Sequence, residues 1–378
     1  MPISSIAINN FRGLCDFRME GAAPVFNLLV GPSEIGKTSV LEAMSLMSVS
    51  TDMAGAVGFN RMRGATVNNQ SDAVAAAKSL FHNFRLQPIE LETAIKSAFG
   101  NVTAKIEIVP VMDDNVVSYR EADKISAQMG TVASTQTARF NGFKRTVEYA
   151  RDFAGKGYNF FRIRDDGVRL DKFVEEEAFF RIDEAGKKHA LSPKDMDFLL
   201  WNAVFICYPD IRVAIDAATT NKREAAIVDI LKMINPQVAG FALSEKTPLI
   251  DIGLDQMMPL HIAGDGLRRV LGMLGNLCSK SYSVHLEDEI GAGVYFGALP
   301  TFLRAVFDFA IREGKQIFAT THSKDVLVAL KEVLTEREDL REDAAVFSFM
   351  HDKKGKVRAG AYLYEDIDRC IANDIEIR

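Results

Sequence analysis

The chain has 378 residues, of which 48% are hydrophobic and 25% are charged, a balance typical of an ordinary folded protein and not of a disordered or fibrous one. Its formal net charge of −6 argues against a general nucleic-acid coat, but allows a local basic surface. The sequence has neither an apolar run of the ~18–20 residues that span a bilayer nor a leader-like start, so we expect a cytoplasmic location and no membrane contact.

The first 50 residues predict strands that lead into a loop and a helix. Residues 6–8 and 17–19 alternate between apolar and polar, and residues 10–13 form a turn between them. Residues 25–30 are an apolar run, which predicts a buried strand. From Lys37 onward the apolar residues recur at helical spacing. The order is therefore strand, glycine-bounded loop, helix.

The middle of the chain predicts a helical insertion, over about residues 51–100, followed by an antiparallel meander. Turn residues, among them Asp165-Asp166-Gly167, separate the predicted strands. These strands are 104–111, 116–120, 146–150, 158–164 and 178–182. Residues 222–234 then predict an amphipathic helix, and no run of heptads indicates a long coiled coil.

In the last third, predicted helices and strands alternate, which is typical of an α/β sheet with helical crossovers. The predicted helices are 266–277, 299–312 and 323–334. The predicted strands are 282–286, 316–320, 345–350 and 356–363.

A phosphate-binding loop follows the third predicted strand. Residues 31–38 read GPSEIGKT and fit G-x-x-x-x-G-K-[ST] at every required position. Gly31 and Gly36 let backbone N–H groups point at phosphate oxygens, and the next helix adds its positive end. Lys37 would neutralise the phosphates, and Thr38 would place its hydroxyl on Mg²⁺. The alternative, an ordinary glycine-bounded turn, does not account for the flanking strand and helix.

Acidic residues follow the predicted strand at 282–286. Asp288 is placed to hold the water shell of Mg²⁺, and Glu289 to orient or deprotonate an attacking water. Read alone, this segment also fits a solvated strand end. His285 is unusual here, because a strand buried on both faces is expected to be continuously apolar.

Two further segments suit phosphate. His322 follows the strand at 316–320 and could reach a γ-phosphate, although a single histidine in this place is often structural. Residues 264–266, Gly-Asp-Gly, open a basic helix and offer free N–H groups, although alone they fit an ordinary helix cap. Three phosphate-suited segments in this order favour the functional interpretation.

Lys37 and Asp288 are 251 positions apart, about twice the usual separation in compact P-loop folds. A large insertion must therefore separate two halves of one site. Residues 221–224 read Asn-Lys-Arg-Glu, precede the acidic strand and end in Glu, so they do not form the base-reading motif of a GTPase. We predict one composite head, with an N-terminal lobe over residues 1–200 and a C-terminal lobe over residues 201–378.

Together these segments resemble the ATP-binding-cassette (ABC) ATPases of the structural-maintenance-of-chromosomes (SMC) type, specifically those similar to the N-terminal part of the OLD nucleases. The segments that carry the resemblance are residues 8–13, 27–38, 264–269, 287–290, 319–323 and 376–378. The resemblance implies an α/β fold: a two-lobed ABC-type P-loop ATPase head with a mixed sheet, helical insertions and no long coiled coil. It also implies a homo-oligomer built on ATP-sandwich dimers, in which the signature loop of one subunit faces the P-loop of the other.

The resemblance assigns roles residue by residue, with ATP and Mg²⁺ as cofactors. It implies catalytic roles for Lys37, Glu289 and His322, and metal contacts from Thr38 and Asp288. Nucleotide contacts in the same subunit would come from Arg12, Gly31, Ser33, Glu34, Gly36, Lys37, Thr38 and Ser39. The partner subunit's nucleotide would be contacted by the signature loop: Gly264, Asp265 and Gly266.

The sequence departs from the family pattern at three positions. The signature serine is Ala263, which removes one hydroxyl contact worth about 1 kcal/mol. Ala292 and Tyr295 stand where the family often has Asn and His. Slow hydrolysis, or use of ATP mainly as a dimer clamp, is consistent with these changes. For the glutamine that couples lobe movement to Mg²⁺, Gln128 and Gln136 are the candidates.

OLD nucleases continue into a toprim nuclease, whereas this chain stops soon after His322. Stand-alone ATPases of this kind resemble subunits of two-gene antiphage systems such as PARIS and Septu. By analogy we expect a sensor ATPase that controls a separate effector, a nuclease, with DNA or a phage protein as the trigger. The alternatives are a low-turnover, ATP-gated scaffold that stores a partner and a DNA-repair-type ATPase. A membrane-transporter ATPase fits the signature loop and the long insertion least.

Overall fold

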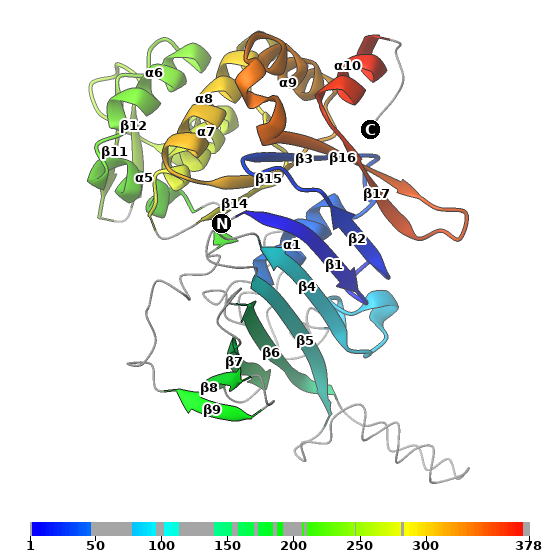
Figure 1. Ribbon diagram of the computed structural model, residues 1–378. Helices are drawn as coiled ribbons and strands as arrows, with labels where there is room; N and C mark the ends of the chain where they lie inside the picture. Colours follow the sequence, from blue (N-terminus) through cyan, green and yellow to red (C-terminus); the bar gives the residue numbers. More distant parts are fainter. Residues whose placement is uncertain are drawn as a thin grey trace.

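The computed structural model describes residues 2–46, 78–95, 102–112, 140–152, 158–169, 173–183, 187–191, 206–207, 210–245, 247–280 and 283–372. The described strands form sheets of eight, six and three strands. The two larger sheets are layered, and helices cover the far face of the six-stranded sheet (Figure 1). In this described part of the chain, no helix is long and apolar enough to cross a membrane.

The eight-stranded sheet has the order β2-β1-β4-β5-β6-β7-β8-β9, and all its pairings are antiparallel. Its strands are β1 (Ile3–Asn9), β2 (Phe17–Glu20), β4 (Ile89–Ile95), β5 (Val102–Met112), β6 (Phe140–Asp152), β7 (Tyr158–Arg169), β8 (Phe173–Asp183) and β9 (Lys188–Leu191). The expected antiparallel meander is confirmed, with strands longer than predicted.

Two expectations about this sheet are wrong. Residues 89–95, which we placed in a helical insertion, form β4, where buried Ile89 and Leu91 alternate with exposed Glu90 and Glu92. Residues 165–167, expected to form a turn, continue β7, because they pair in register with β8. Residues 51–77, 96–100 and 116–120 lie outside the described residues.

The six-stranded sheet has the order β10-β14-β15-β3-β16-β17. Its first five strands are parallel, and β17 is antiparallel to β16. These strands are β10 (Ile206–Cys207), β14 (Val284–Glu287), β15 (Gln316–Thr320), β3 (Phe26–Val30), β16 (Ala344–His351) and β17 (Val357–Tyr362). Strand β3 therefore joins the N-terminal part of the chain to the last third. The lobe division at residue 200 stays a prediction, because residues 192–205 lie outside the described part.

The helices and short elements complete the fold. The predicted helices are present as α1 (Lys37–Leu46), α6 (Glu224–Ile234), α7 (Asp265–Leu277), α8 (Leu299–Arg312) and α9 (Lys324–Glu336). Besides β9 and β10, the elements that we did not predict are α5 (Ile211–Thr220), α10 (Tyr364–Ala372), the small sheet of β11 (Gly240–Ser244), β12 (Thr247–Asp251) and β13 (Met258–Pro259), and the 3₁₀ turns η1 (His82–Phe84), η3 (Leu260–Ile262), η4 (Phe296–Ala298) and η5 (Glu338–Asp343). Apart from the helices α5 and α10, these elements are too short to show a clear period.

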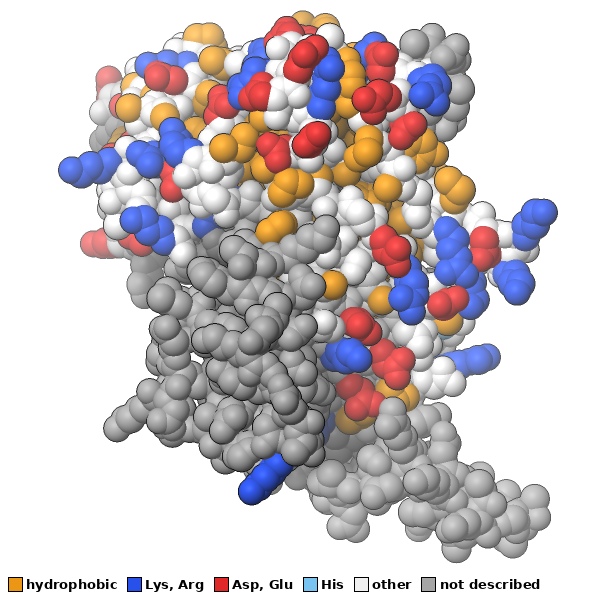
Figure 2. Space-filling model, in the orientation of Figure 1, with side chains coloured by type: hydrophobic (Ala, Val, Ile, Leu, Met, Phe, Trp, Pro, Cys, Tyr) orange, Lys and Arg blue, Asp and Glu red, His pale blue; other side chains and the backbone are white. Residues whose placement is uncertain are grey.

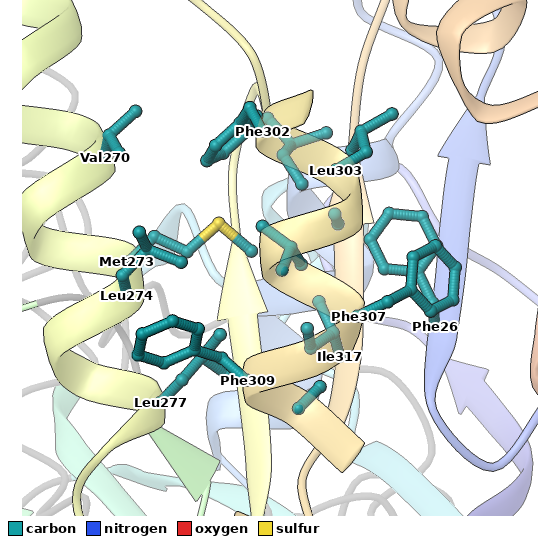
Figure 3. Packing of buried hydrophobic residues seen from close by; sticks show 14 of the residues in the cluster. Phe26, Val270, Met273, Leu274, Leu277, Phe302, Leu303, Phe307, Phe309 and Ile317 are labelled. Carbon is teal, nitrogen blue, oxygen red and sulfur yellow. The ribbon is translucent and has the colours of Figure 1, made fainter. Parts of the chain in front are cut away.

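Two hydrophobic cores lie on opposite faces of the six-stranded sheet. One is shared by α1 and the eight-stranded sheet, and the other by helices α5 to α9. Adjacent residues of a strand point to opposite faces, so in β3 Leu29 enters the first core whereas Leu28 enters the second. In the second core, Met273 of α7 and Phe309 of α8 point toward each other, and Phe307 lies against Phe26 (Figure 3). This packing gives the loops at the edge of the sheet a rigid support.

Candidate active site

The carboxyl ends of three adjacent parallel strands, β14, β15 and β3, meet at one edge of the six-stranded sheet. The segments that follow them are the acidic pair, the segment with His322 and the P-loop, respectively. In α/β sheets, ligands bind outside this edge. The sheet therefore brings together motifs that lie far apart in the sequence.

The P-loop has the backbone that a phosphate cradle requires. Gly31 and Gly36 have φ angles of 145° and 107°, and Glu34 has a φ of 64°. A Cβ atom on Gly31 would lie 2.9 Å from the carbonyl oxygen of Phe349, so a side chain is excluded on steric as well as conformational grounds. Ser33 and Glu34 are exposed at the rim of the loop. These features fit a group that is recognised by curled backbone N–H groups.

The Lys37 side chain folds back over the P-loop. Its ammonium donates to the carbonyl oxygens of Gly31 at 2.7 Å and Pro32 at 2.9 Å. Burial lowers the pKa of Lys37, while the carboxylates of Glu289 and Asp288 act in the opposite direction. An ionised phosphate oxygen is a stronger acceptor than a carbonyl oxygen. A bound phosphate would therefore compete well for this ammonium.

Thr38 and Asp288 meet directly. The Thr38 hydroxyl donates to the Asp288 carboxylate, at 2.9 Å from Oδ1 and 3.2 Å from Oδ2. Hydroxyl and carboxylate oxygens are ligands that Mg²⁺ accepts. The two residues expected to contact the metal are thus side by side, and their chemistry fits that ion. Ser39, the next residue after Thr38, is buried in the first turn of α1.

Glu289 and His322 form an accessible pair. Glu289 Oε2 lies 2.7 Å from His322 Nδ1, and the side chains are 32% and 65% exposed. Glu289 has a φ of 59°, a conformation that a residue with a side chain rarely adopts. A carboxylate held in this way beside an imidazole can accept a proton from a water and keep that water in place.

Thr320, to which the sequence analysis gave no role, binds both members of the acidic pair. Its hydroxyl donates to Asp288 Oδ1 at 2.6 Å and accepts the N–H of Glu289 at 2.9 Å. Thr320 is fully buried at the end of β15. The available sequence signal was a polar residue that ends an otherwise apolar strand.

The signature loop is linked to the acidic turn of the same chain, by which we mean residues 288–293 after β14. Gly264 is the N-cap of α7, and Asp265 accepts hydrogen bonds from Arg268 and Arg269, which lower the pKa of Asp265. Arg269 also donates to the carbonyl oxygen of Asp288 at 3.2 Å. A Cβ atom on Gly266 would lie 2.2 Å from the carbonyl oxygen of Gly293. The helix start and the acidic turn are therefore in backbone contact.

Arg12 and His285 occupy different surroundings. Arg12 has a φ of 48°, and its Nε lies 2.7 Å from Glu42 Oε2 of α1, with both side chains largely buried. The nucleotide contact expected of Arg12 stays a prediction. His285 is buried, with Nε2 3.1 Å from Glu287 Oε2. This pairing gives one ring nitrogen of the buried histidine a polar partner. Gln128 and Gln136 lie outside the described residues.

The sheet topology, the P-loop backbone and the Thr38–Asp288 contact fit a P-loop ATPase with an α/β fold. The model of the AAA ATPase domain family matches residues 1–190. The chain belongs to this family. It is therefore an ATPase, and ATP is its substrate.

Comparisons with individual proteins give more distant similarities. An ATP/GTP phosphatase of Helicobacter pylori is 19% identical over 365 residues, which cover 93% of each chain. The DNA replication and repair protein RecF of Vibrio cholerae is 31% identical over 110 residues, 28% of each chain. An SMC head bound to the C-winged helix domain of ScpA aligns over 98% of this chain and 100% of that chain, with a TM-score of 0.46 and 11% identity.

Proposed function

We propose that this protein hydrolyses ATP at a site assembled from both ends of the chain and that the nucleotide state controls a separate effector protein. The hydrogen bond between Thr38 and Asp288, 250 positions apart, is the observation that carries the site. It joins the end of the P-loop to the acidic turn.

The residues divide the chemistry among them. The P-loop, with Gly31 and Gly36, would bind the phosphates through its N–H groups, and Lys37 would add a positive charge. Thr38 and Asp288 would hold Mg²⁺, which neutralises charge on the phosphate oxygens when bound. Glu289 would orient and deprotonate the attacking water, and His322 would contact the γ-phosphate.

The proposed working unit is a homodimer with shared ATP sites. Gly264 and Asp265 are exposed at the start of α7, so a second copy can reach them. The positive end of a helix suits a phosphate group. Ala263 at the serine position supports slow turnover. Slow turnover suits a regulatory ATPase, and we propose that the effector is a nuclease in an antiphage system, with DNA or a phage protein as trigger.

Substitution of Glu289 by Gln tests the hydrolase role. The Glu289→Gln protein should bind ATP with a Kd within about threefold of the wild type but lose at least about 100-fold in kcat, because Gln cannot accept the proton. Glu332→Gln is the matched control, since Glu332 is half exposed and pairs with Arg304 at 3.6 Å. If Glu289→Gln abolishes turnover but leaves control of the effector intact, ATP serves as a clamp and the scaffold alternative is correct.

The DNA-repair alternative is supported by the local similarity to RecF. On the face shown in Figure 2, however, Lys and Arg side chains are interspersed with Asp and Glu over the described residues. Proteins that bind the DNA backbone lose affinity steeply as salt increases. Binding to a DNA duplex with a steep salt dependence, measured by fluorescence anisotropy, would support the repair alternative and a DNA trigger alike. Absence of DNA binding would contradict the repair alternative and leave a phage protein as the proposed trigger.

A further inference from the structure

Thr320 holds the backbone on both sides of Glu289. Its side-chain oxygen accepts the N–H of Glu289 at 2.9 Å. Its main-chain oxygen accepts the N–H of Ile290, also at 2.9 Å. One residue of β15 therefore fixes two consecutive peptide groups, and the α-carbon of Glu289 lies between them.

These two hydrogen bonds hold a strained backbone conformation. Glu289 has a φ of 59°, and such a conformation persists only where its surroundings enforce it. Thr320 is fully buried, so water does not compete for its hydroxyl. The hydroxyl also donates to Asp288 Oδ1 at 2.6 Å. With one donor and one acceptor contact in use, its hydrogen-bonding capacity is directed at the two acidic residues.

We infer that Thr320 is a positioning residue for ATP hydrolysis: its hydroxyl sets the backbone conformation of Glu289 and the orientation of the Asp288 carboxylate. The inference rests on the proposed role of Glu289. Thr320 touches neither the nucleotide nor the water in this account. It acts through Glu289, whose carboxylate must stand within hydrogen-bond reach of the water, and small displacements of a reacting group are costly in rate.

Three variants separate this role from simple packing. Thr320→Val keeps the shape of the side chain and removes the hydroxyl, whereas Thr320→Ser keeps the hydroxyl. Thr93→Val is the matched control. Thr93 is also buried, and its hydroxyl donates to the carbonyl oxygen of Ser5 in the eight-stranded sheet. Thr320→Val loses two hydrogen bonds of its hydroxyl, both to the acidic pair, whereas Thr93→Val loses one, which lies away from it.

Amide hydrogen exchange in the nucleotide-free protein measures how well Thr320 protects the amides of Glu289 and Ile290. In Thr320→Val, the amide of Glu289 should exchange at least about tenfold faster, because it has lost its acceptor. The amide of Ile290 should change less, because the carbonyl oxygen of residue 320 remains. Thr320→Ser and Thr93→Val should leave the Glu289 amide within about threefold of the wild-type rate. Equal exchange of this amide in Thr320→Val and wild type would overturn the inference.

Steady-state kinetics then test the consequence for hydrolysis. Thr320→Val should lower kcat at least about tenfold while KM for ATP changes less than about threefold. Thr320→Ser should restore kcat to within about threefold of the wild type. In the Glu289→Gln background, adding Thr320→Val should cost little more, since groups that act as a unit are not additive. A wild-type kcat in Thr320→Val, or no rescue by Ser, would contradict the positioning role.

The proposed role of Glu289 and the inferred role of Thr320 can be tested separately. If Glu289→Gln retains the wild-type kcat, the proposed role of Glu289 is wrong, whatever Thr320 does. If Glu289→Gln is inactive but Thr320→Val is fully active, only the inference about Thr320 is wrong.

Discussion

At the residue scale, two neighbouring arginines share one carboxylate but make different further contacts. Arg268 and Arg269 both bind Asp265, and only Arg269 also binds the carbonyl oxygen of Asp288. Burial is deeper for Arg269, with 36% of its side chain exposed against 52% for Arg268. Partly buried hydrogen bonds from a charged donor are worth more than exposed ion pairs. Arg269 is therefore the arginine that connects the signature loop to the acidic turn.

Substitution of each arginine by Ala should show this difference. Arg269→Ala should lower the free energy of unfolding by about 1–2 kcal/mol, and Arg268→Ala by less than about 0.5 kcal/mol. Urea unfolding at pH 7 measures both. Because the pKa of Asp265 is lowered in the folded protein, its ion pairs stabilise the fold at a pH above the ordinary Asp pKa. This stabilisation is lost as the pH falls through the lowered pKa. Equal losses in the two variants would contradict the assignment.

The residues of the site were predictable from the sequence to different degrees. Lys37 and Thr38 belong to a local motif with a fixed spacing, so the sequence alone makes them candidate site residues. The role of Thr320 was not predictable from the sequence, because its partners lie 31 and 32 positions away and meet it only when β14 and β15 pair. Residues that act through tertiary contacts leave no periodic or motif signal in a single sequence.

At the element scale, close packing of α5 against α7 fixes the helix that carries the signature loop. A Cβ atom on Gly275 would lie 2.5 Å from the carbonyl oxygen of Ala214, whereas one on Gly272 would lie 3.4 Å from a side-chain atom of Ile211. Backbone cannot yield as a side-chain end can. We therefore expect that α7 tolerates a side chain at Gly272 but not at Gly275.

The Gly275→Ala and Gly272→Ala variants form a matched pair. Gly275→Ala should destabilise the protein by about 1–3 kcal/mol, because the helices must separate. Gly272→Ala should be neutral or stabilising by up to about 1 kcal/mol, because Ala favours the helix. Thermal unfolding of the two variants measures the difference. A greater loss of stability in Gly272→Ala would show that the α5–α7 contact is described wrongly.

At this scale, our prediction of a helical insertion over residues 51–100 was wrong for residues 89–95, which form strand β4. The segment IELETAI begins with alternating apolar and polar residues, as a half-buried strand does, yet we placed it in a helical insertion. The pairing of β4 with both β1 and β5 settles its conformation. By contrast, β3 and β15 were predicted well because their residues are mostly apolar, as expected of strands that are buried on both faces.

At the scale of the whole molecule, the two ends of the chain complete one sheet. Strand β3 lies between β15 and β16, so the P-loop reaches the acidic turn although some 250 residues separate them. The order of motifs in the sequence predicts the fold class, but it does not predict which strands lie next to β3. The site is thus a property of the folded sheet and not of either end alone.

The steady-state rate of ATP hydrolysis by Asp288→Asn tests the central claim that both ends of the chain form one hydrolytic site. Asp308→Asn is the control, since Asp308 is 58% exposed and pairs with Arg337 away from this edge of the sheet. Our account predicts that Asp288→Asn lowers kcat at least about 100-fold and that Asp308→Asn stays within twofold of the wild type. A wild-type kcat in a folded Asp288→Asn protein would contradict the account.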